Sequence, residues 1–398
     1  MLGRGRGRSW RSALLFGKAA DAIHAYPRFG PRFMSRKLHS GSAWPWPWKC
    51  KVLADTDLMR ALSETVDFDA LCRWMDEQCI GHGPLEGVEP LGGGTQNILI
   101  RFRRDGQPYV LRRGPPDLRH GSNQAMSREA QMLAALDGTG IPHPNLVALC
   151  KDESVIGAVF FLMESIKGVN AVESGLPAEA RRRAGLEFIE AVANLGEIAP
   201  ETVGLSGFGQ PEGFLGRQAG RWMGQLESYA KYPEWPGTSD LPDPEPIARW
   251  LEDNCPAETR PGILHGDCHF ANAMFDPESG ELMALIDWEM STLGDPLLDL
   301  GWTIATWPGE DYRMFELGEG YPKLGELIAA YAARSTRSMD SLPWYGVCAC
   351  FKLGSILEGT YARALAGRAP LVVGKRLHDL TQMLFGRAER LMSGNLTL

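Results

Sequence analysis

The sequence predicts a two-lobed protein of the α+β class. Short apolar runs bounded by turn residues fill residues 85–165, whereas apolar residues recur at helical spacing from about residue 177 onwards. These patterns predict a small antiparallel β-sheet with one helix in the N-terminal lobe and a larger, mainly helical C-terminal lobe. An extended hinge near residues 163–168 would join them. We therefore place the lobes at residues 59–166 and 167–398 and expect a ligand to bind between them.

Residues 1–58 are interpreted as a basic leader outside both lobes. Residues 1–51 contain seven arginines, four lysines and one acidic residue, so their net charge is +10, and the rest of the chain must carry −18 to give the total of −8. The leader ends in WPWPWK, where alternating prolines block both helix and sheet. It is either a transit-type targeting segment or a translated upstream stretch of a chain that starts at Met34 or Met59. We expect a cytoplasmic protein, or a mitochondrial one if the leader is a transit segment.

Composition argues against several classes of protein. A body this acidic is a poor candidate for nonspecific nucleic-acid binding, and no apolar run approaches the ~18 residues that a membrane helix needs. The eight cysteines form no C-x-x-C pair and no zinc pattern, which favours reduced thiols. We expect no nucleic-acid and no membrane partner, and the sequence leaves the oligomeric state open.

The N-terminal lobe should begin with a helix and a β-hairpin. Residues 60–79 repeat apolar side chains at helical spacing. Residues 97–102 and 109–112 are strand-like and flank the turn residues Asp105 and Gly106. This order predicts one helix followed by two antiparallel strands.

A second helix and a second hairpin complete the predicted lobe. The helix should occupy about residues 127–136, and the hairpin should lie within residues 145–168. Beyond the hinge, three segments have strong helical character: residues 177–199, 213–231 and 243–254. More helix is expected from residue 300 to the end of the chain.

Two aspartates and one asparagine form the pattern that indicates chemistry. Asp267 and Asn272 belong to H-G-D-x-x-x-x-N, and Asp287 begins D-W-E after an apolar strand. Phosphoryl transfer needs one carboxylate that positions a hydroxyl and accepts its proton, and a second carboxylate with an amide oxygen to hold Mg²⁺ on the phosphates. Singly, Asp287 could be a turn residue and Asn272 an Asx cap. The pair, in this order and with a predicted hairpin between them, favours the catalytic interpretation.

Neighbouring polar residues are expected to serve structure. Asp295 precedes a proline and fits a helix cap, and we interpret Asp299 as structural as well. His265 should order the loop around Asp267 by hydrogen bonding, and His269 is left without a role.

Several stretches, in this order, resemble a known superfamily: LGGGTQNILIRF, YVLRRGPP, REAQMLAAL, FLMESIKG, GRQAGRW, ILHGDCHFAN and LIDWEMSTLGDPLLDLGW. The last two are specific and the others are weak alone. The chain resembles the aminoglycoside phosphotransferase (choline kinase-like) superfamily over about residues 59–398, and most of all the kinase-like domains fused to acyl-CoA dehydrogenases. The resemblance implies a protein-kinase-like fold and phosphorylation of a small-molecule hydroxyl by ATP or GTP with Mg²⁺.

The resemblance also implies roles for individual residues. It makes Asp267 the catalytic base, with Asn272 and Asp287 as the Mg²⁺ ligands. It assigns nucleotide binding to Gly92, Gly93, Gly94, Thr95, Arg112, Glu129, Met163, Glu164 and Ile166. Arg112 stands where a typical kinase has the lysine of V-A-I-K, with Arg113 as a second candidate, and an arginine can bind phosphate bidentately. Glu289 of D-W-E could add a metal contact or stabilise the loop.

The acceptor is the least defined part of the prediction. Arg217 and Arg221 fall on one helix face beside a tryptophan, and Trp302 lies in a C-terminal region of nine acidic and eleven basic residues. Ordinary surface charge and core aromatics would also explain these residues. The hypothesis is an anionic, partly apolar acceptor such as a hydroxyacyl-CoA, because a pocket for polycationic aminoglycosides should be acidic. The alternatives are an aminoglycoside or macrolide phosphotransferase and, in another class, a pseudokinase that binds partners.

Overall fold

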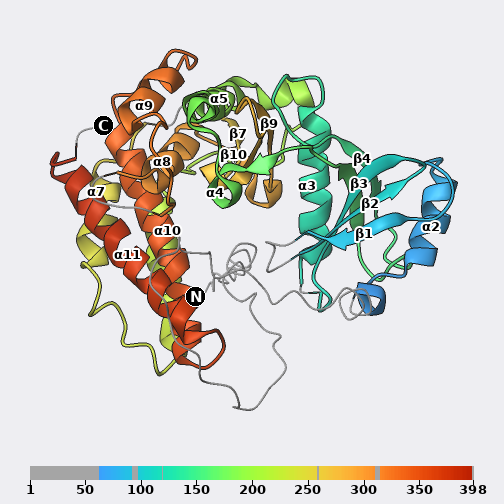
Figure 1. Ribbon diagram of the computed structural model, residues 1–398. Helices are drawn as coiled ribbons and strands as arrows, with labels where there is room; N and C mark the ends of the chain where they lie inside the picture. Colours follow the sequence, from blue (N-terminus) through green and yellow to red (C-terminus); the bar gives the residue numbers. More distant parts are fainter. Residues whose placement is uncertain (1–61, 92–96, 119, 258–259, 310–313, 397–398) are drawn as a thin grey trace, which may run out of the picture.

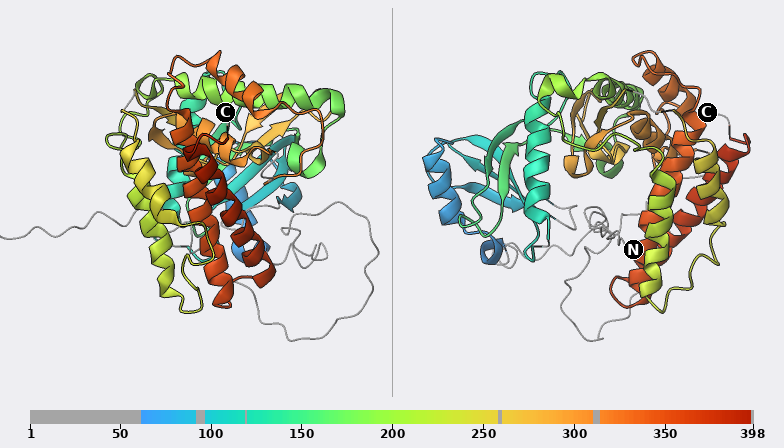
Figure 2. Two further views of the ribbon diagram at one scale, coloured as in Figure 1. Left: turned by 90° about the vertical axis from the view of Figure 1, so that its left-hand side faces the viewer. Right: turned by 180° about the vertical axis from the view of Figure 1, so that it is seen from behind.

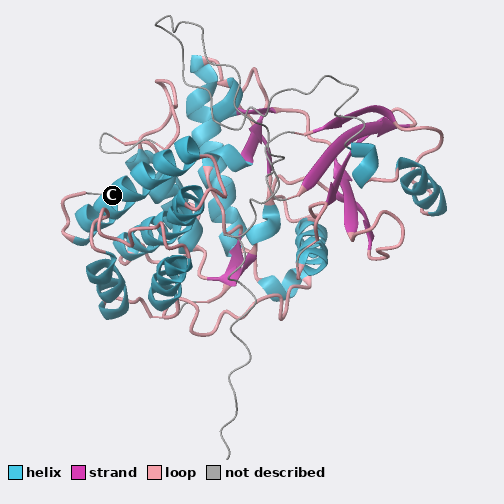
Figure 3. Cartoon of the chain, turned by 90° about the horizontal axis from the view of Figure 1, so that it is seen from below, coloured by secondary structure: helices cyan, strands magenta, loops and turns pink. Residues whose placement is uncertain are grey.

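The chain has two lobes, one built around a β-sheet and one mainly helical (Figures 1 and 3). The computed structural model describes residues 62–396, apart from 92–96, 119, 258–259 and 310–313. Within this described part, no helix is both long and apolar enough to cross a membrane. The predicted α+β class with two lobes is confirmed.

A five-stranded antiparallel sheet forms the N-terminal lobe, with the strand order β1-β2-β3-β5-β4. Its strands are β1 (Glu86–Pro90), β2 (Ile98–Arg104), β3 (Gln107–Arg113), β4 (Leu146–Cys150) and β5 (Phe160–Glu164). Asp105 and Gly106 connect β2 to β3 with φ values of 51° and 72°, and positive φ at both turn residues suits a tight hairpin. Both predicted hairpins are confirmed. Strand β1 was not predicted, because its sequence EGVEP does not alternate apolar and polar residues.

Helices cover both faces of this sheet. Leu111 and Phe160 share a core with α2 (Phe68–Glu77), whereas their neighbours Val110 and Phe161 share a core with α3 (Ser122–Leu136). The split follows from the strand period of two, which points successive side chains to opposite faces. Helix α3 therefore lies between the sheet and the C-terminal lobe (Figures 1 and 2). The helix predicted at 127–136 is confirmed and starts five residues earlier.

The single helix predicted at residues 60–79 is wrong in its first third. One helical turn covers residues 62–65, and α2 begins only after Asp67. The Oδ1 atom of Asp67 accepts a hydrogen bond of 2.8 Å from the N–H of Ala70, which caps a new helix. The apolar spacing continued across this break and concealed it.

The C-terminal lobe contains eight described α-helices. They are α4 (Ala171–Ser174), α5 (Ala178–Glu197), α6 (Gln218–Glu227), α7 (Pro244–Asp253), α8 (Leu297–Thr306), α9 (Leu324–Ala332), α10 (Leu342–Leu365) and α11 (Leu371–Met392). Helices α10 and α11 pack along each other (Figure 1). The three segments predicted as helical before residue 255 are confirmed as α5, α6 and α7.

Short strands between α7 and α8 carry the region of Asp267, Asn272 and Asp287. Strand β7 (Gly262–Leu264) pairs with β10 (Thr292–Gly294), and β8 (Ala273–Phe275) lies between β6 (Val169–Asn170) and β9 (Leu282–Leu285). The hairpin predicted between the two aspartates is therefore confirmed as β8–β9. The N–H of Leu285 donates to Pro142 O at 2.8 Å, so this hairpin also contacts the segment between α3 and β4.

Candidate active site

The loop after β7 is tied down by a buried carboxylate. The N–H groups of His265 and Gly266 donate to the two oxygens of Asp299 at 2.7 and 2.9 Å, and Asp299, on α8, is only 3% exposed. Gly266 has a φ of 83°, and a Cβ there would lie 2.2 Å from Met290 O, so the position requires glycine. These contacts give Asp299 the structural role that we expected.

Asp267 emerges from this loop with both carboxylate oxygens oriented. Trp302 Nε1 donates to Oδ1 at 3.0 Å, Asn272 Nδ2 donates to Oδ2 at 3.1 Å, and His269 Nε2 lies 3.5 Å from Oδ1. Burial acts to raise the pKa of Asp267, but the charges of His269 and Lys352 and the hydrogen bond from Asn272 outweigh it and hold that pKa below its ordinary value. The side chain is 29% exposed, so an ionised carboxylate remains accessible to a substrate.

Lys352 on α10 contacts the same loop, although it is not among the site residues predicted from the sequence. Its Nζ donates to Gly266 O at 2.8 Å and lies 4.2 Å from the centroid of the Trp302 ring. The one signal in the sequence is a lysine inside the otherwise apolar run CACFKLGSIL. Only the fold brings this residue to Asp267, 85 positions earlier in the chain.

The β8–β9 hairpin brings Asn272 and Asp287 to the same end of one ladder. Ala273 pairs with Leu285, and the N–H of Ile286 donates to Asn272 O at 2.9 Å. Asp287 follows with a φ of 66° and a ψ of 65°, a left-handed conformation that is uncommon for residues other than glycine. Such conformations are often found at functional sites.

His265 links the loop of Asp267 to the segment of Asp287. Its Nε2 lies 2.9 Å from Ile286 O, and a carbonyl only accepts, so Nε2 carries the proton. Burial lowers the pKa of His265, and the ring is therefore neutral. The ordering role predicted for His265 is confirmed by these contacts.

Arg112 joins the sheet to the D-W-E segment. Its Nε forms an ion pair of 2.9 Å with Glu129, and its NH2 group donates to Asp287 Oδ1 at 2.9 Å and to Glu289 Oε2 at 3.1 Å. Glu289 also accepts a hydrogen bond of 2.8 Å from Asn97. Burial, which opposes charging, raises the pKa of Glu129 and of Glu289, while the guanidinium favours their charged forms. Three carboxyl groups thus lie around one guanidinium group.

The residues around Asp287 fit a hard divalent cation. The Asp287 side chain is 39% exposed, and the Asn272 amide turns its nitrogen to Asp267, which leaves its oxygen for another partner. Oxygen ligands of this kind, completed by substrate phosphates and water, are those that Mg²⁺ prefers. A cation bound there would in turn favour the charged forms of the carboxyl groups around Arg112.

The other residues predicted to contact the nucleotide lie at the end of β5, in the segment after it, or outside the described part of the chain. Gly92, Gly93, Gly94 and Thr95 belong to the segment 92–96, which lies outside the described residues. Met163 and Glu164 end β5, where the N–H of Glu164 already donates to Asn145 O at 2.9 Å. Ile166 follows in the hinge. Their contact with a base stays a prediction.

The structure separates the predicted acceptor residues. Trp302 contacts Asp267 directly. The Arg221 guanidinium lies 4.8 Å from the Trp222 ring centroid, and that ring lies 5.8 Å from Lys352 Nζ. Arg217 instead donates to the backbone carbonyls of residues 210 and 212, so its guanidinium stabilises the segment just before α6.

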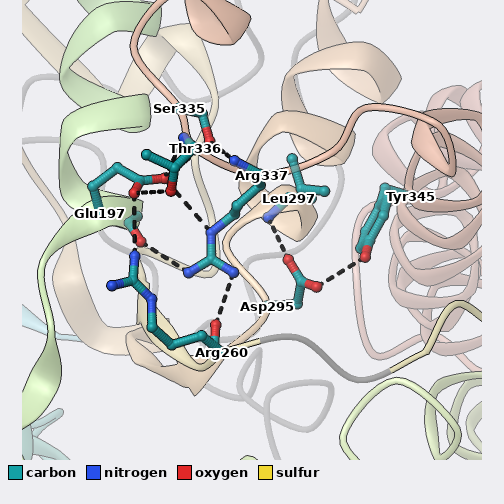
Figure 4. Close-up of polar contacts among 9 residues, drawn as sticks. Glu197, Arg260, Asp295, Leu297, Ser335, Thr336, Arg337 and Tyr345 are labelled. Atoms are coloured by element: carbon teal, nitrogen blue, oxygen red, sulfur yellow. Dashed lines mark hydrogen bonds and ion pairs between the residues drawn. The ribbon is translucent and has the colours of Figure 1, made fainter.

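A polar cluster anchors β7 at its start. The carboxylate of Glu197 accepts hydrogen bonds from Ser335 Oγ at 3.0 Å, Thr336 Oγ1 at 2.7 Å and the Thr336 N–H at 3.2 Å, and it forms ion pairs with Arg260 and Arg337 (Figure 4). Arg337 in turn donates to Arg260 O at 2.7 Å. The end of α5 and the turn after α9 are thereby fixed to the chain that enters β7.

Asp295 fixes the start of α8. Its Oδ1 accepts from the Leu297 N–H at 3.0 Å and its Oδ2 from Tyr345 Oη at 2.9 Å (Figure 4). The aspartate predicted as a helix cap thus bonds the first N–H of α8, although Pro296 occupies the N-cap position itself. Because α8 carries both Asp299 and Trp302, the cap positions the helix that holds Asp267.

A family model described as "Phosphotransferase enzyme family" matches residues 87–337, which include Arg112, Asp267 and Asp287. The chain belongs to the phosphotransferase enzyme family. A curated relative, acyl-CoA dehydrogenase family member 11 of Gallus gallus, is 29% identical over 320 residues, which cover 76% of this chain and 40% of the relative. Another, probable acyl-CoA dehydrogenase IBR3 of Arabidopsis thaliana, is 31% identical over 333 residues, with the same two coverages. The chain thus spans about two fifths of the length of these relatives.

Solved structures of phosphotransferases share the fold. A crystal structure from Ralstonia eutropha JMP134, provisionally assigned as an aminoglycoside phosphotransferase, has a TM-score of 0.67 and 28% identity, and the match covers 82% of this chain and 99% of that one. The GDP complex of aminoglycoside 2'-phosphotransferase-IIIa has a TM-score of 0.55 and 16% identity, with 83% and 100% covered. The kinase-like fold implied by the sequence resemblance is confirmed.

Proposed function

We propose that this phosphotransferase family member is a Mg²⁺-dependent small-molecule kinase that transfers the γ-phosphoryl group of ATP, or GTP, to a substrate hydroxyl. One observation carries the proposal. Asp267 is held ionised and partly exposed in a loop whose neighbour Asn272 shares a hairpin end with Asp287, and Asp287 is bonded to Arg112. A base, two oxygen donors for a metal and a phosphate-binding cation thus lie in one connected set.

Each residue has a step in this reaction. Asp267 accepts the proton of the acceptor hydroxyl. The hydroxyl oxygen forms a bond to the γ-phosphorus while the bond between that phosphorus and the bridging oxygen of the nucleotide breaks, and the nucleoside diphosphate leaves. Arg112, oriented by Glu129, binds phosphate oxygens. Asn272 and Asp287 would hold Mg²⁺, which neutralises charge that develops on the phosphates.

The charges near Asp267 favour an anionic acceptor. Lys352 contacts the loop of Asp267, and Arg221 and Lys352 both lie near the Trp222 ring. Two cations beside this loop suit a molecule with negative charge and disfavour a polycation, whereas the Trp222 and Trp302 rings are buried and pack in the core. The names of the curated relatives refer to acyl-CoA dehydrogenases, and a hydroxyacyl-CoA combines a hydroxyl, an apolar chain and phosphates. We propose this class as the acceptor.

The alternative acceptors are antibiotics, because the structural neighbours include aminoglycoside and macrolide phosphotransferases. The test measures ADP release from Mg²⁺-ATP with a panel of hydroxyacyl-CoAs, aminoglycosides, macrolides, choline and homoserine. Asp267→Asn is the control and should lower turnover by about 10²- to 10⁴-fold, the usual contribution of a general base. Turnover with an antibiotic alone would replace the proposed acceptor, and nucleotide binding without turnover on any acceptor would favour a pseudokinase.

A further inference from the structure

A continuous series of contacts runs from α6 to the catalytic loop. Arg221 lies over Trp222, Trp222 lies beside Lys352, and Lys352 lies over Trp302, at 4.8, 5.8 and 4.2 Å respectively. Trp302 then donates its hydrogen bond to Asp267. Lys352 is the centre of this series, because it contacts both tryptophan rings.

Lys352 also contacts the backbone that carries Asp267. Its Nζ donates to the carbonyl of Gly266, the residue directly before the aspartate. One ammonium group therefore touches the peptide that precedes Asp267 and the indole that holds its Oδ1. Carboxylates of Asp267 and Asp299, the thiol of Cys348 and the guanidinium of Arg221 are the ionisable groups that act on it.

Lys352 carries its amino group into a buried setting, and burial lowers the pKa of that group. Residues around it on α10, among them Cys350, Phe351 and Leu353, are buried, and an ammonium group loses hydration there. A methionine would fill the same space without that loss. The fold of the loop does not depend on the lysine alone, since Asp299 already binds two of its N–H groups. The ammonium is thus suited to a task more specific than folding.

We propose that Lys352 is a positioning residue for phosphoryl transfer, which fixes the Gly266 carbonyl and the Trp302 indole so that the Asp267 carboxylate is aimed at the acceptor hydroxyl. The inference rests on the proposed kinase activity. It predicts an effect on the chemical step and none on nucleotide binding, because within the described part of the chain Lys352 contacts Gly266, Trp222 and Trp302 and neither Arg112 nor Asp287.

The test compares Lys352→Met, Lys352→Arg and the control Lys231→Met. Lys231 also lies over an aromatic ring, at 5.4 Å from the centroid of Tyr232. It belongs to the 3-10 helix Ser228–Lys231, which follows α6. We expect Lys352→Met to lower kcat by about 100-fold, the size of effect that a misplacement of about 1 Å can have. The KM for ATP should stay within about twofold, Lys352→Arg should recover part of kcat, and Lys231→Met should behave as wild type.

A second readout does not require turnover. Hydrogen–deuterium exchange of the peptide 262–275 should become faster in Lys352→Met and stay unchanged in Lys231→Met. The inference would be overturned if Lys352→Met left kcat unchanged, if it raised the KM for ATP by as large a factor as it lowered kcat, or if it left the exchange rate unchanged. If Lys352→Met does not fold, Lys352→Leu, which also removes the donor to Gly266 O, takes its place under the same criteria. A wild-type protein that phosphorylates no acceptor would instead refute the proposed function, and the exchange measurement would still report whether Lys352 holds the loop.

Discussion

Arg112 donates a hydrogen bond of 2.9 Å to Asp287, so the cation expected to bind phosphate is bonded to the carboxylate expected to bind the metal. A metal at Asp287 and a phosphate at Arg112 would each compete with this contact. We therefore expect the metal and the nucleotide to bind together as one complex. The metal then replaces Arg112 as the partner of Asp287, and the phosphate replaces Asp287 as the partner of Arg112, so that neither charge is left unpaired. The same guanidinium keeps its ion pair with Glu129 on α3, which fixes it to the sheet.

The ion pair between Arg112 and Glu129 predicts a non-additive effect on stability. Glu129 is 3% exposed, and Arg112→Met would leave its buried carboxyl group without the cation that pairs with it. We expect the free energy of unfolding to fall by about 3 kcal/mol in Arg112→Met and to recover in the double variant Arg112→Met with Glu129→Gln. Urea unfolding of the four proteins measures the coupling. Additive losses would show that Glu129 does not depend on Arg112.

Asp287 should be essential for turnover but not for folding. Asp287→Asn keeps the size of the side chain, and asparagine tolerates the left-handed conformation that this position requires. We expect an unchanged melting temperature, turnover reduced to the background of Asp267→Asn, and loss of the dependence of ATP affinity on Mg²⁺. Calorimetric titration with ATP, with and without Mg²⁺, measures this dependence. Activity that survives Asp287→Ala would contradict the metal assignment.

Glu197 should stabilise the protein in a pH-dependent way. Burial acts to raise the pKa of Glu197, but the hydrogen bonds from Thr336 and Ser335 and the charge of Arg337 outweigh it and lower that pKa. A group whose pKa is lower when folded stabilises the fold above its unfolded pKa, about 4.3, and loses that contribution as the pH falls through its folded pKa. We expect Glu197→Gln to cost about 1–3 kcal/mol at pH 7.

The matched measurement is urea unfolding of wild type and Glu197→Gln at pH 7, 5 and 3. The difference between the two proteins should persist at pH 5 and shrink towards pH 3. Glu245→Gln is a suitable control, because Glu245 is an exposed residue in the first turn of α7. A difference that does not vary with pH would mean that shape, and not the charge of Glu197, matters in this cluster.

Local sequence signals predicted the residues that act within short segments. The spacing of Asp267, Asn272 and Asp287 identified the motif region because a loop and one hairpin contain all three. The break before α2 was missed because Asp67 caps a new helix while the apolar spacing runs on.

Contacts between distant segments were not predictable in the same way. Asp299 binds the loop of Asp267 from α8, and Lys352 reaches it from α10. No periodicity or spacing relates such residues, since their proximity depends on how helices pack. Arg217 and Arg221 show the converse, because their spacing suggested a common role, whereas their guanidinium groups have different partners.

That difference predicts how the acceptor is recognised. Arg221→Glu should raise the KM for an anionic acceptor about tenfold or more, since it replaces a cation beside Trp222 by an anion, and it should leave the KM for ATP unchanged. Arg368→Glu is the matched control, because Arg368 lies 5.4 Å from the Tyr232 ring, an arginine over an aromatic ring with no recorded contact to the loop of Asp267. Steady-state kinetics at two ionic strengths should show the Arg221 effect weaken with salt if it is electrostatic. Equal KM values for Arg221→Glu and Arg368→Glu would remove Arg221 from the acceptor site and, with it, the main reason to prefer an anionic acceptor over an antibiotic.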